Sequence, residues 1–280
     1  MISVALGLAA AMTMTTPDQN LDDYRTSGFL LGVQAWTFNK FTAFEAVEKT
    51  AMAGGKAIEF FPGQKVSADL GSMGPDMSED AITKLKEHLA KHHVKAVAFG
   101  VVGIDKNEDN ARKLFEWAKK MDIGILNTES TESLDTIEKM VKAYDIRVGF
   151  HNHPRRANDA NYKVWDPAYV YSLVKDRDAR IGSCADTGHW VRSGIKPVDA
   201  IKTLKGRIVS SHLKDLNEFS PEGHDVPFGT GVSDMAGILR EYRKMKFMGS
   251  MSIEYEYNWD NSVPDVGQCI GFVRGYGLGL

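Results

Sequence analysis

Residues 147–258 contain four short apolar segments: RVGFHNHP (147–154), IGSCADTGHW (181–190), IVSSHLKD (208–215) and MSIEYEYN (251–258). Each is typical of a strand that is buried on both faces, and each carries a metal-ligand type of side chain near its end. The intervals between the segments are roughly one strand–helix unit long. In a parallel barrel the carboxyl ends of such strands meet on one rim. We therefore expect four side chains to lie together: His151, Asp186, His212 and Glu254.

This group is a candidate metal site. Two imidazoles and two carboxylates suit one divalent ion, with Mn, Co, Mg, Fe and Zn as alternatives. A single buried His or Glu is more often a hydrogen-bonded polar group of the core. Four ligand-type residues at the ends of four successive strands are harder to explain structurally, so we predict one metal ion held between them.

The rest of the chain also alternates strand-like and helix-like segments. Apolar runs such as LGVQAWTF (31–38) are followed by periodic amphipathic runs such as SEDAITKLKEHLAKHH (78–93). Eight such units fit within the chain, and no GxGxxG motif or P-loop follows an early strand. The pattern predicts an α/β fold, a single (β/α)8 TIM barrel spanning residues 28–280.

Composition limits the classes of function. Hydrophobic residues make up 43% of the chain and charged residues 25%, which is ordinary for a globular protein. The formal net charge of −3 argues against a dedicated nucleic-acid surface. The two cysteines, Cys184 and Cys269, cannot form a disulfide framework, and we expect Cys184 to be a buried thiol.

The first residues have a distinct character. ISVALGLAAAM (2–12) is apolar and rich in small residues, like the apolar region of a secretory signal peptide. No basic segment precedes it, so a disordered leader is the alternative, and we assign residues 1–27 to a signal-like or disordered leader. The stretch is too short to span a bilayer. A signal peptide would imply a periplasmic or exported protein, and its absence a cytoplasmic one.

Further residues at the strand ends could contact a substrate. Trp36 could stack on the apolar face of a sugar, although aromatic side chains also fill barrels. Glu59 could bind a distal hydroxyl or serve as a structural partner inside the barrel. Lys214 follows His212 by two residues and should share its face of the strand. It could bind a substrate oxygen or pair with a carboxylate of the last strand segment.

Several motifs together resemble the sugar phosphate isomerase/epimerase superfamily, which has a xylose isomerase-like TIM barrel. The resemblance covers roughly residues 30–280. The segments that carry it are AIEFFPGQ (57–64), HNHP (151–154), DTGHW (186–190), SHLKD (211–215), VPFGTG (226–231) and SIEYE (252–256).

The resemblance implies roles for individual residues. In that family one divalent ion is held by a strand-five carboxylate, an Asp, a His and a last-strand Glu. Carried over to this chain, the last three are Asp186, His212 and Glu254. The family's Asp-x-x-His pattern matches Asp186 and His189, which implies that His189 contacts a substrate oxygen.

Strand five departs from the family pattern. Many members have Glu-Asn-His where this chain has His151-Asn152-His153. His151 therefore resembles a replacement for the usual Glu ligand, and Glu129 is the nearest carboxylate that could supply the ligand instead. In epimerase members the strand-five Glu is also one of two bases. A metal-bound imidazole cannot accept a proton through the same nitrogen, so the pair of bases is altered here.

These residues predict carbonyl chemistry on a keto-sugar or keto-polyol. A divalent cation polarises a ketone, and the enediolate that follows proton removal is held on the cation. Glu254 is the candidate base, and Glu129, His153 or His189 is the candidate second acid or base. Reprotonation at another position gives an isomerase or epimerase. Loss of a β-leaving group gives a lyase or dehydratase, for example one that cleaves a 3-keto-glycoside.

Two other classes of protein are alternatives. A repair nuclease of the same superfamily would need more metal ligands and a basic groove, which the acidic charge balance disfavours. A non-catalytic sugar-binding barrel would keep the fold without the reaction. We expect a small carbohydrate as the partner, no nucleic acid and no stable membrane insertion, with a homo-oligomer as an open alternative.

Overall fold

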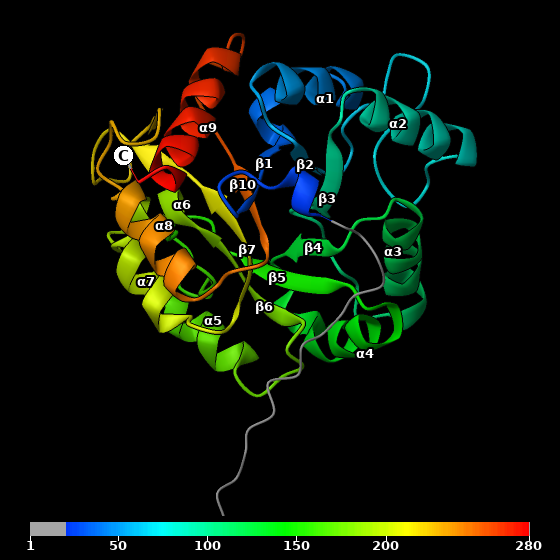
Figure 1. Ribbon diagram of the computed structural model, residues 1–280. Helices are drawn as coiled ribbons and strands as arrows, with labels where there is room; N and C mark the ends of the chain where they lie inside the picture. Colours follow the sequence, from blue (N-terminus) through cyan, green and yellow to red (C-terminus); the bar gives the residue numbers. More distant parts are fainter. Residues whose placement is uncertain (1–20, 280) are drawn as a thin grey trace, which may run out of the picture.

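A closed barrel of eight parallel strands forms the centre of the computed structural model, which describes residues 21–279 (Figure 1). Neighbouring strands pair in the order in which they occur in the chain, and β10 pairs with β1 to close the barrel. The predicted (β/α)8 barrel is confirmed. Its strands are β1 (Leu30–Gln34), β2 (Ala57–Phe60), β3 (Lys95–Phe99), β4 (Ile125–Thr128), β5 (Arg147–His151), β6 (Ile181–Asp186), β7 (Ile208–Leu213) and β10 (Ser250–Ile253).

Helices surround this barrel on its outer side (Figure 1). A short antiparallel hairpin of β8 (Asp215–Leu216) and β9 (Asp225–Val226) follows β7. None of the helices within residues 21–279 combines the length and apolar character needed to cross a membrane. The α-helices are α1 (Ala43–Met52), α2 (Glu79–Lys91), α3 (Glu108–Lys120), α4 (Leu134–Tyr144), α5 (Pro167–Val174), α6 (Thr187–Arg192), α7 (Pro197–Thr203), α8 (Met235–Lys244) and α9 (Val263–Gly277), and the 3-10 helices are η1 (Asp22–Tyr24), η2 (Ala35–Phe38) and η3 (Thr131–Ser133).

Local sequence signals explain where these helices begin and which side they bury. Helix α3 begins after Asn107, whose side chain accepts hydrogen bonds from the backbone N–H groups of Asp109 and Asn110. Acidic residues occupy its first turn and lysines its last, as the helix dipole favours. Its apolar residues recur at helical spacing and are buried against the barrel: Ala111, Leu114, Phe115, Trp117 and Ala118.

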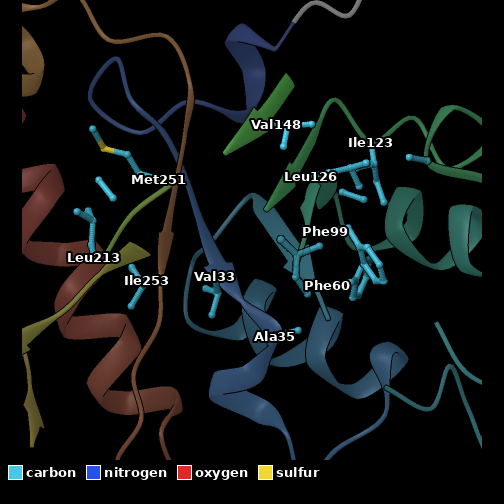
Figure 2. Packing of buried hydrophobic residues seen from close by; sticks show 14 of the residues in the cluster. Val33, Ala35, Phe60, Phe99, Ile123, Leu126, Val148, Leu213, Met251 and Ile253 are labelled. Atoms are coloured by element: carbon cyan, nitrogen blue, oxygen red, sulfur yellow. The ribbon is translucent and has the colours of Figure 1, made fainter. Parts of the chain in front are cut away.

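The core lies between the barrel and the helices. Strand residues such as Phe60, Phe99, Leu213 and Met251 are fully buried, and Figure 2 shows them among side chains from strands on both sides of the barrel. Both faces of these strands are covered, and the buried strand residues include polar ones such as Asn127, Ser210 and Ser252. Cys184 is fully buried on β6, as predicted, and it is a free thiol.

Two predicted strand segments end earlier than expected. Residues 35–38 form η2, because the Gln34 side chain accepts a hydrogen bond from the Trp36 N–H and turns the chain. Residues 187–192 form α6 instead of extending β6. Residues 1–20 of the predicted leader lie outside the described residues. The assignment of residues 1–27 to a leader therefore stays a prediction.

Candidate metal centre and active site

The four predicted metal ligands meet at the carboxyl ends of β5, β6, β7 and β10. Each offers one ligand atom, these atoms lie within 4.8 Å of one another, and all four residues are buried. His212 Nδ1 lies 3.1 Å from Glu254 Oε2 and 3.9 Å from Asp186 Oδ2, and His151 Nε2 lies 3.6 Å from the same Asp186 oxygen. Atoms that bind one cation at about 2.0–2.2 Å each are separated by distances of this order.

His151 supports a metal at this place. Its side chain is almost fully buried, and neither ring nitrogen has a hydrogen-bond partner among the described residues. An unpaired buried polar atom costs free energy, roughly 1–3 kcal/mol, so such atoms are rare in stable proteins. A ligand bond from one nitrogen to a divalent ion would remove part of that cost. The donor set therefore fits the predicted ion.

Lys214 contributes a positive charge to the same place. Its Nζ donates to Asp186 Oδ2 at 2.8 Å and to Glu254 Oε2, and it lies 3.1 Å from Glu256 Oε2. The side chain is fully buried, and it passes so close to Gly188 that a Cβ there would lie 2.6 Å from Lys214 Cβ. The ammonium and a divalent ion would therefore compete for the same two carboxylate oxygens.

Burial and neighbouring charges shift the pKa values of all four candidate ligands. Burial raises the pKa of Glu254, but Lys214 and His212 outweigh it and hold that pKa well below its usual value. Burial lowers the pKa of His212, but Cys184, Glu59 and Glu254 outweigh it and raise that pKa well above normal. The negative charge of these carboxylates favours a positive charge at the imidazole, whether a proton or a metal ion that replaces it on the nitrogen.

Glu59 supports the centre from inside the barrel. Its Oε1 lies 3.0 Å from His212 Nε2 and accepts a hydrogen bond from Asn127 Nδ2 at 2.7 Å, and its Oε2 accepts from Ser252 Oγ. This contact leaves His212 Nδ1 facing Asp186, in the carboxylate–histidine arrangement that orients metal ligands. Glu59 is fully buried. Its contacts match the structural alternative, and its role in sugar binding stays a prediction.

Asp186 has two separate functions at the end of β6. Its Oδ1 accepts the backbone N–H of His189 at 2.7 Å and so begins α6, while Oδ2 faces the cluster. Asn152 exchanges two hydrogen bonds with the Asp186 backbone, at 2.9 and 3.0 Å, and fixes the end of β5 against β6. The Asp-x-x-His spacing thus places His189 beside the centre, with Nε2 3.8 Å from Asp186 Oδ2.

Glu129 and His153 form a hydrogen-bonded pair at the mouth of the barrel. Nδ1 of His153 lies 2.6 Å from Glu129 Oε1, and the Tyr162 hydroxyl donates to the same oxygen. The His153 side chain is 42% exposed, whereas His151 beside it is buried, with a ring-centroid separation of 4.7 Å. Glu129, His151 and His153 thus form a second group whose ligand-type atoms lie within 4.8 Å of one another, and His151 belongs to both this group and the four-residue cluster.

Of the other residues, Trp36 lies away from the four-residue cluster, and three more were not predicted from the sequence. Trp36 is 41% exposed and packs edge-on against Phe61 at 5.1 Å; no described contact joins it to the cluster, and its sugar-binding role stays a prediction. Sequence reasoning missed Tyr162, Arg192 and Asp215. Of these, Asp215 could have been found from the sequence, because it ends the SHLKD motif. In the structure its carboxylate accepts hydrogen bonds from the backbone N–H groups of Gly229, Gly231 and Ser233, in and beyond VPFGTG.

The fold and the site together define a class of protein: a parallel barrel with a buried His and carboxylate centre at the carboxyl ends of its strands. The chain matches the family described as xylose isomerase-like TIM barrel over residues 47–274, and it belongs to that family. The predicted resemblance is confirmed. No match is found among curated proteins.

Solved structures of similar fold include several enzymes. A putative uncharacterized protein from Parabacteroides distasonis is 30% identical, with a TM-score of 0.71 over 89% of this chain and 99% of that one. A D-psicose 3-epimerase from Clostridium cellulolyticum, solved with D-tagatose, is 16% identical, with a TM-score of 0.65 over 89% and 99%. A probable 3-DHS dehydratase from Bacillus anthracis is 14% identical, with a TM-score of 0.60 over 86% and 97%.

Proposed function

We propose that this protein is a divalent-metal-dependent isomerase or epimerase that removes a proton next to the carbonyl of a keto-sugar or keto-polyol. The observation that carries the proposal is the buried cluster of His151, Asp186, His212 and Glu254 at the rim where such barrels hold their active sites. Sugar 3-epimerases of similar fold support the substrate class.

The four clustered residues would hold the ion. When bound, a divalent cation supplies Lewis-acid polarisation of a carbonyl oxygen, which makes the neighbouring C–H more acidic. The chain adds its own donors beside that oxygen. The Lys214 ammonium and the ring of His189 lie next to the cluster, with Lys214 Nζ 3.5 Å from His189 Nε2. Both stabilise the negative charge that proton removal places on the substrate oxygen.

Glu254 is the proposed base. Its carboxylate is held ionised, since Lys214 and His212 lower its pKa. Oε2 faces Lys214 Nζ and His212 Nδ1, the nitrogen with which His212 would hold the ion, whereas Oε1 accepts no hydrogen bond from the described residues. Oε1 is therefore the oxygen that takes the proton from carbon.

His153 is the proposed second acid or base. The Glu129 carboxylate can only accept, so the proton of a neutral His153 ring lies on Nδ1 and Nε2 keeps a lone pair. Nε2 can take a proton from one substrate atom and return it to another. Its exposure at the mouth of the barrel gives substrate access to it. Return of a proton to carbon from this side completes epimerisation or isomerisation.

Elimination is a second candidate reaction, and one observation favours it. Strand β5 ends in His151, so the cluster lacks the second carboxylate base that the family resemblance implies for epimerisation. Nε2 of His153, after it has taken a proton from the substrate, can instead pass that proton to the oxygen of a β-leaving group, while Glu129 holds the proton on Nδ1. Loss of that group would give a lyase or dehydratase.

The test is deuterium uptake from D2O into ketohexoses and 3-keto-glucosides, followed by NMR and mass spectrometry of the products. We expect exchange next to the carbonyl with the ion-loaded protein and none after the ion is stripped. Glu254→Gln should abolish exchange, while the matched variant Glu256→Gln, which alters another carboxylate beside Lys214, should retain it. Full exchange in Glu254→Gln with the ion still bound would refute the base assignment. Saturable sugar binding without exchange would indicate a binding protein.

A further inference from the structure

Arg192, the last residue of α6, joins three segments of the chain around the site. Its Nε donates to the backbone carbonyl of Gly223 and its Nη2 to Asp225 Oδ2, both at 3.0 Å and both in or next to the β8–β9 hairpin. Its Nη1 donates to Glu256 Oε2, beyond β10, at 3.2 Å. The side chain is only 13% exposed. The guanidinium is therefore fixed in one orientation.

The same Nη1 lies 3.1 Å from Nδ1 of His189. A guanidinium has five N–H donors, no acceptor and a permanent charge. The other ring nitrogen, Nε2, also faces a donor, Nζ of Lys214, but at the longer distance of 3.5 Å, so the shorter Arg192 contact makes Nδ1 the acceptor, without a proton. A neutral imidazole of this kind keeps its proton on Nε2.

We propose that Arg192 is a positioning residue that locks His189 as a neutral Nε2–H donor. That N–H points to the cluster, 3.5 Å from Lys214 Nζ and 3.8 Å from Asp186 Oδ2. The inference rests on the proposed function, because it assigns His189 a task at the same site. A neutral imidazole donates a hydrogen bond to a substrate oxygen that gains negative charge, and it keeps its own proton.

His153 has the opposite tautomer. Its Nδ1 donates to Glu129, whereas Nδ1 of His189 accepts from Arg192. The two rings lie side by side, with centroids 5.1 Å apart. One substrate therefore meets a lone pair from His153 and an N–H from His189. This division removes His189 from the candidates for the second acid or base.

The arrangement also restricts the substrate. Because Nε2 of His189 can only donate, the group that it meets must be an acceptor, such as a ketone or hydroxyl oxygen. A sugar analogue that lacks this oxygen leaves a buried N–H without a partner. Such analogues are rejected strongly, by about 10⁴-fold or more in sites of this type.

The direct test is ring nitrogen NMR of the full chain labelled with ¹⁵N-histidine, loaded with diamagnetic Mg²⁺. The chain has eight histidines, and His189→Gln identifies the signals of His189. We expect a pyridine-type Nδ1 and a pyrrole-type Nε2 in the wild-type protein. In Arg192→Met we expect a mixture of tautomers. Arg192→Lys keeps the positive charge but lacks the planar guanidinium, so it should also give a mixture of His189 tautomers. This variant serves as the test if Arg192→Met fails to fold.

Arg180→Met is the matched control. Arg180 is 18% exposed and pairs with Asp178 and Asp145, but it precedes β6 at the opposite end of the barrel. The Arg180→Met substitution should lower the stability of the protein and leave the His189 nitrogen signals unchanged. A protonated Nδ1 in the wild-type protein, or an unchanged tautomer in both Arg192 variants, would overturn the proposal.

Turnover supplies a separate readout. With any sugar that the wild-type protein converts, Arg192→Met should lower kcat by about ten- to a hundredfold and change KM less, since the donor acts mainly in the transition state. An unchanged kcat would also count against the proposal. The NMR result needs no substrate, so failure of the tautomer assignment can be told apart from failure of the proposed reaction.

Discussion

Lys214 sets the charge balance at the scale of single residues. It is a fully buried ammonium whose ion-pair partners are Asp186, Glu254 and Glu256, two of which are also candidate metal ligands. A buried lysine of this kind is stable only because carboxylates surround it. It neutralises part of their charge, and the negative charge that remains would attract the proposed divalent ion.

We therefore expect Lys214→Met to bind Mn²⁺ about ten- to a hundredfold more tightly than the wild-type protein in calorimetric titrations, because a competing positive charge is removed. Lys95→Met is the control, since Lys95 begins β3 at the opposite end of the barrel. Equal affinity in Lys214→Met and wild type would show that the ammonium and the ion do not share these oxygens.

Glu129 makes the stability of the folded protein depend on pH. Burial raises its pKa, but hydrogen bonds from His153 and Tyr162 outweigh burial and lower the pKa to about 2. A carboxyl group with a lowered pKa in the folded state contributes stability above its unfolded pKa, and that stability is lost as the pH falls toward 2.

Glu129→Gln should accordingly be less stable than the wild-type protein by about 1–3 kcal/mol near pH 6, and the difference should shrink toward pH 3. Urea unfolding at several pH values measures this difference. Glu132→Gln, at an exposed position in the same loop, corrects for the loss of one charge. A difference that stays constant over this range would contradict the lowered pKa.

At the scale of elements, Asp215 connects the end of β7 to the segment that follows the β8–β9 hairpin. Its carboxylate accepts backbone N–H groups of Gly229, Gly231 and Ser233 at 2.8–3.0 Å, and it is buried. A Cβ at Gly231 would lie 2.4 Å from an Asp215 oxygen, so glycine is required there. One side chain thus holds the segment after the β8–β9 hairpin in place.

Asp215→Asn should lose at least one of these hydrogen bonds, since an amide offers one acceptor oxygen. We expect faster amide hydrogen exchange at Gly229, Gly231 and Ser233, and a loss of about 1–3 kcal/mol in the free energy of unfolding. Asp166→Asn, which alters the N-terminal cap of α5, should leave amide hydrogen exchange at Gly229, Gly231 and Ser233 unchanged. Unchanged protection in Asp215→Asn would mean that the loop is held by other contacts.

The elements differ in how far the sequence predicts them. The alternation of apolar runs and amphipathic helices predicts the barrel, and strand spacing predicts that His151, Asp186, His212 and Glu254 meet. Short elements such as α6 and the β8–β9 hairpin were missed, because two to six residues give no periodicity. The partners of Glu59 and Arg192 depend on side-chain direction across the barrel, which spacing along the chain does not contain.

At the scale of the whole molecule, the ion should stabilise the fold. A ligand that binds only the folded state at 100 times its dissociation constant adds about 2.7 kcal/mol, which is about 5–10 °C in melting temperature for a chain of this size. We expect this shift with Mn²⁺ in the wild-type protein. Asp186→Asn keeps a capping oxygen for α6 but removes a ligand charge, so its shift should be much smaller. Equal shifts would place the ion elsewhere.

Closure of the barrel depends on strands that are far apart in the chain. Leu30 of β1 pairs with Ser250 of β10, and Glu254 follows β10 directly. A ribosome releases this chain from its amino end, so β1 has an unpaired edge until nearly all of the protein has emerged. The same late strand completes both the barrel and the cluster. A prematurely terminated product that stops before Ser250 therefore lacks both the closing strand and the last residue of the cluster.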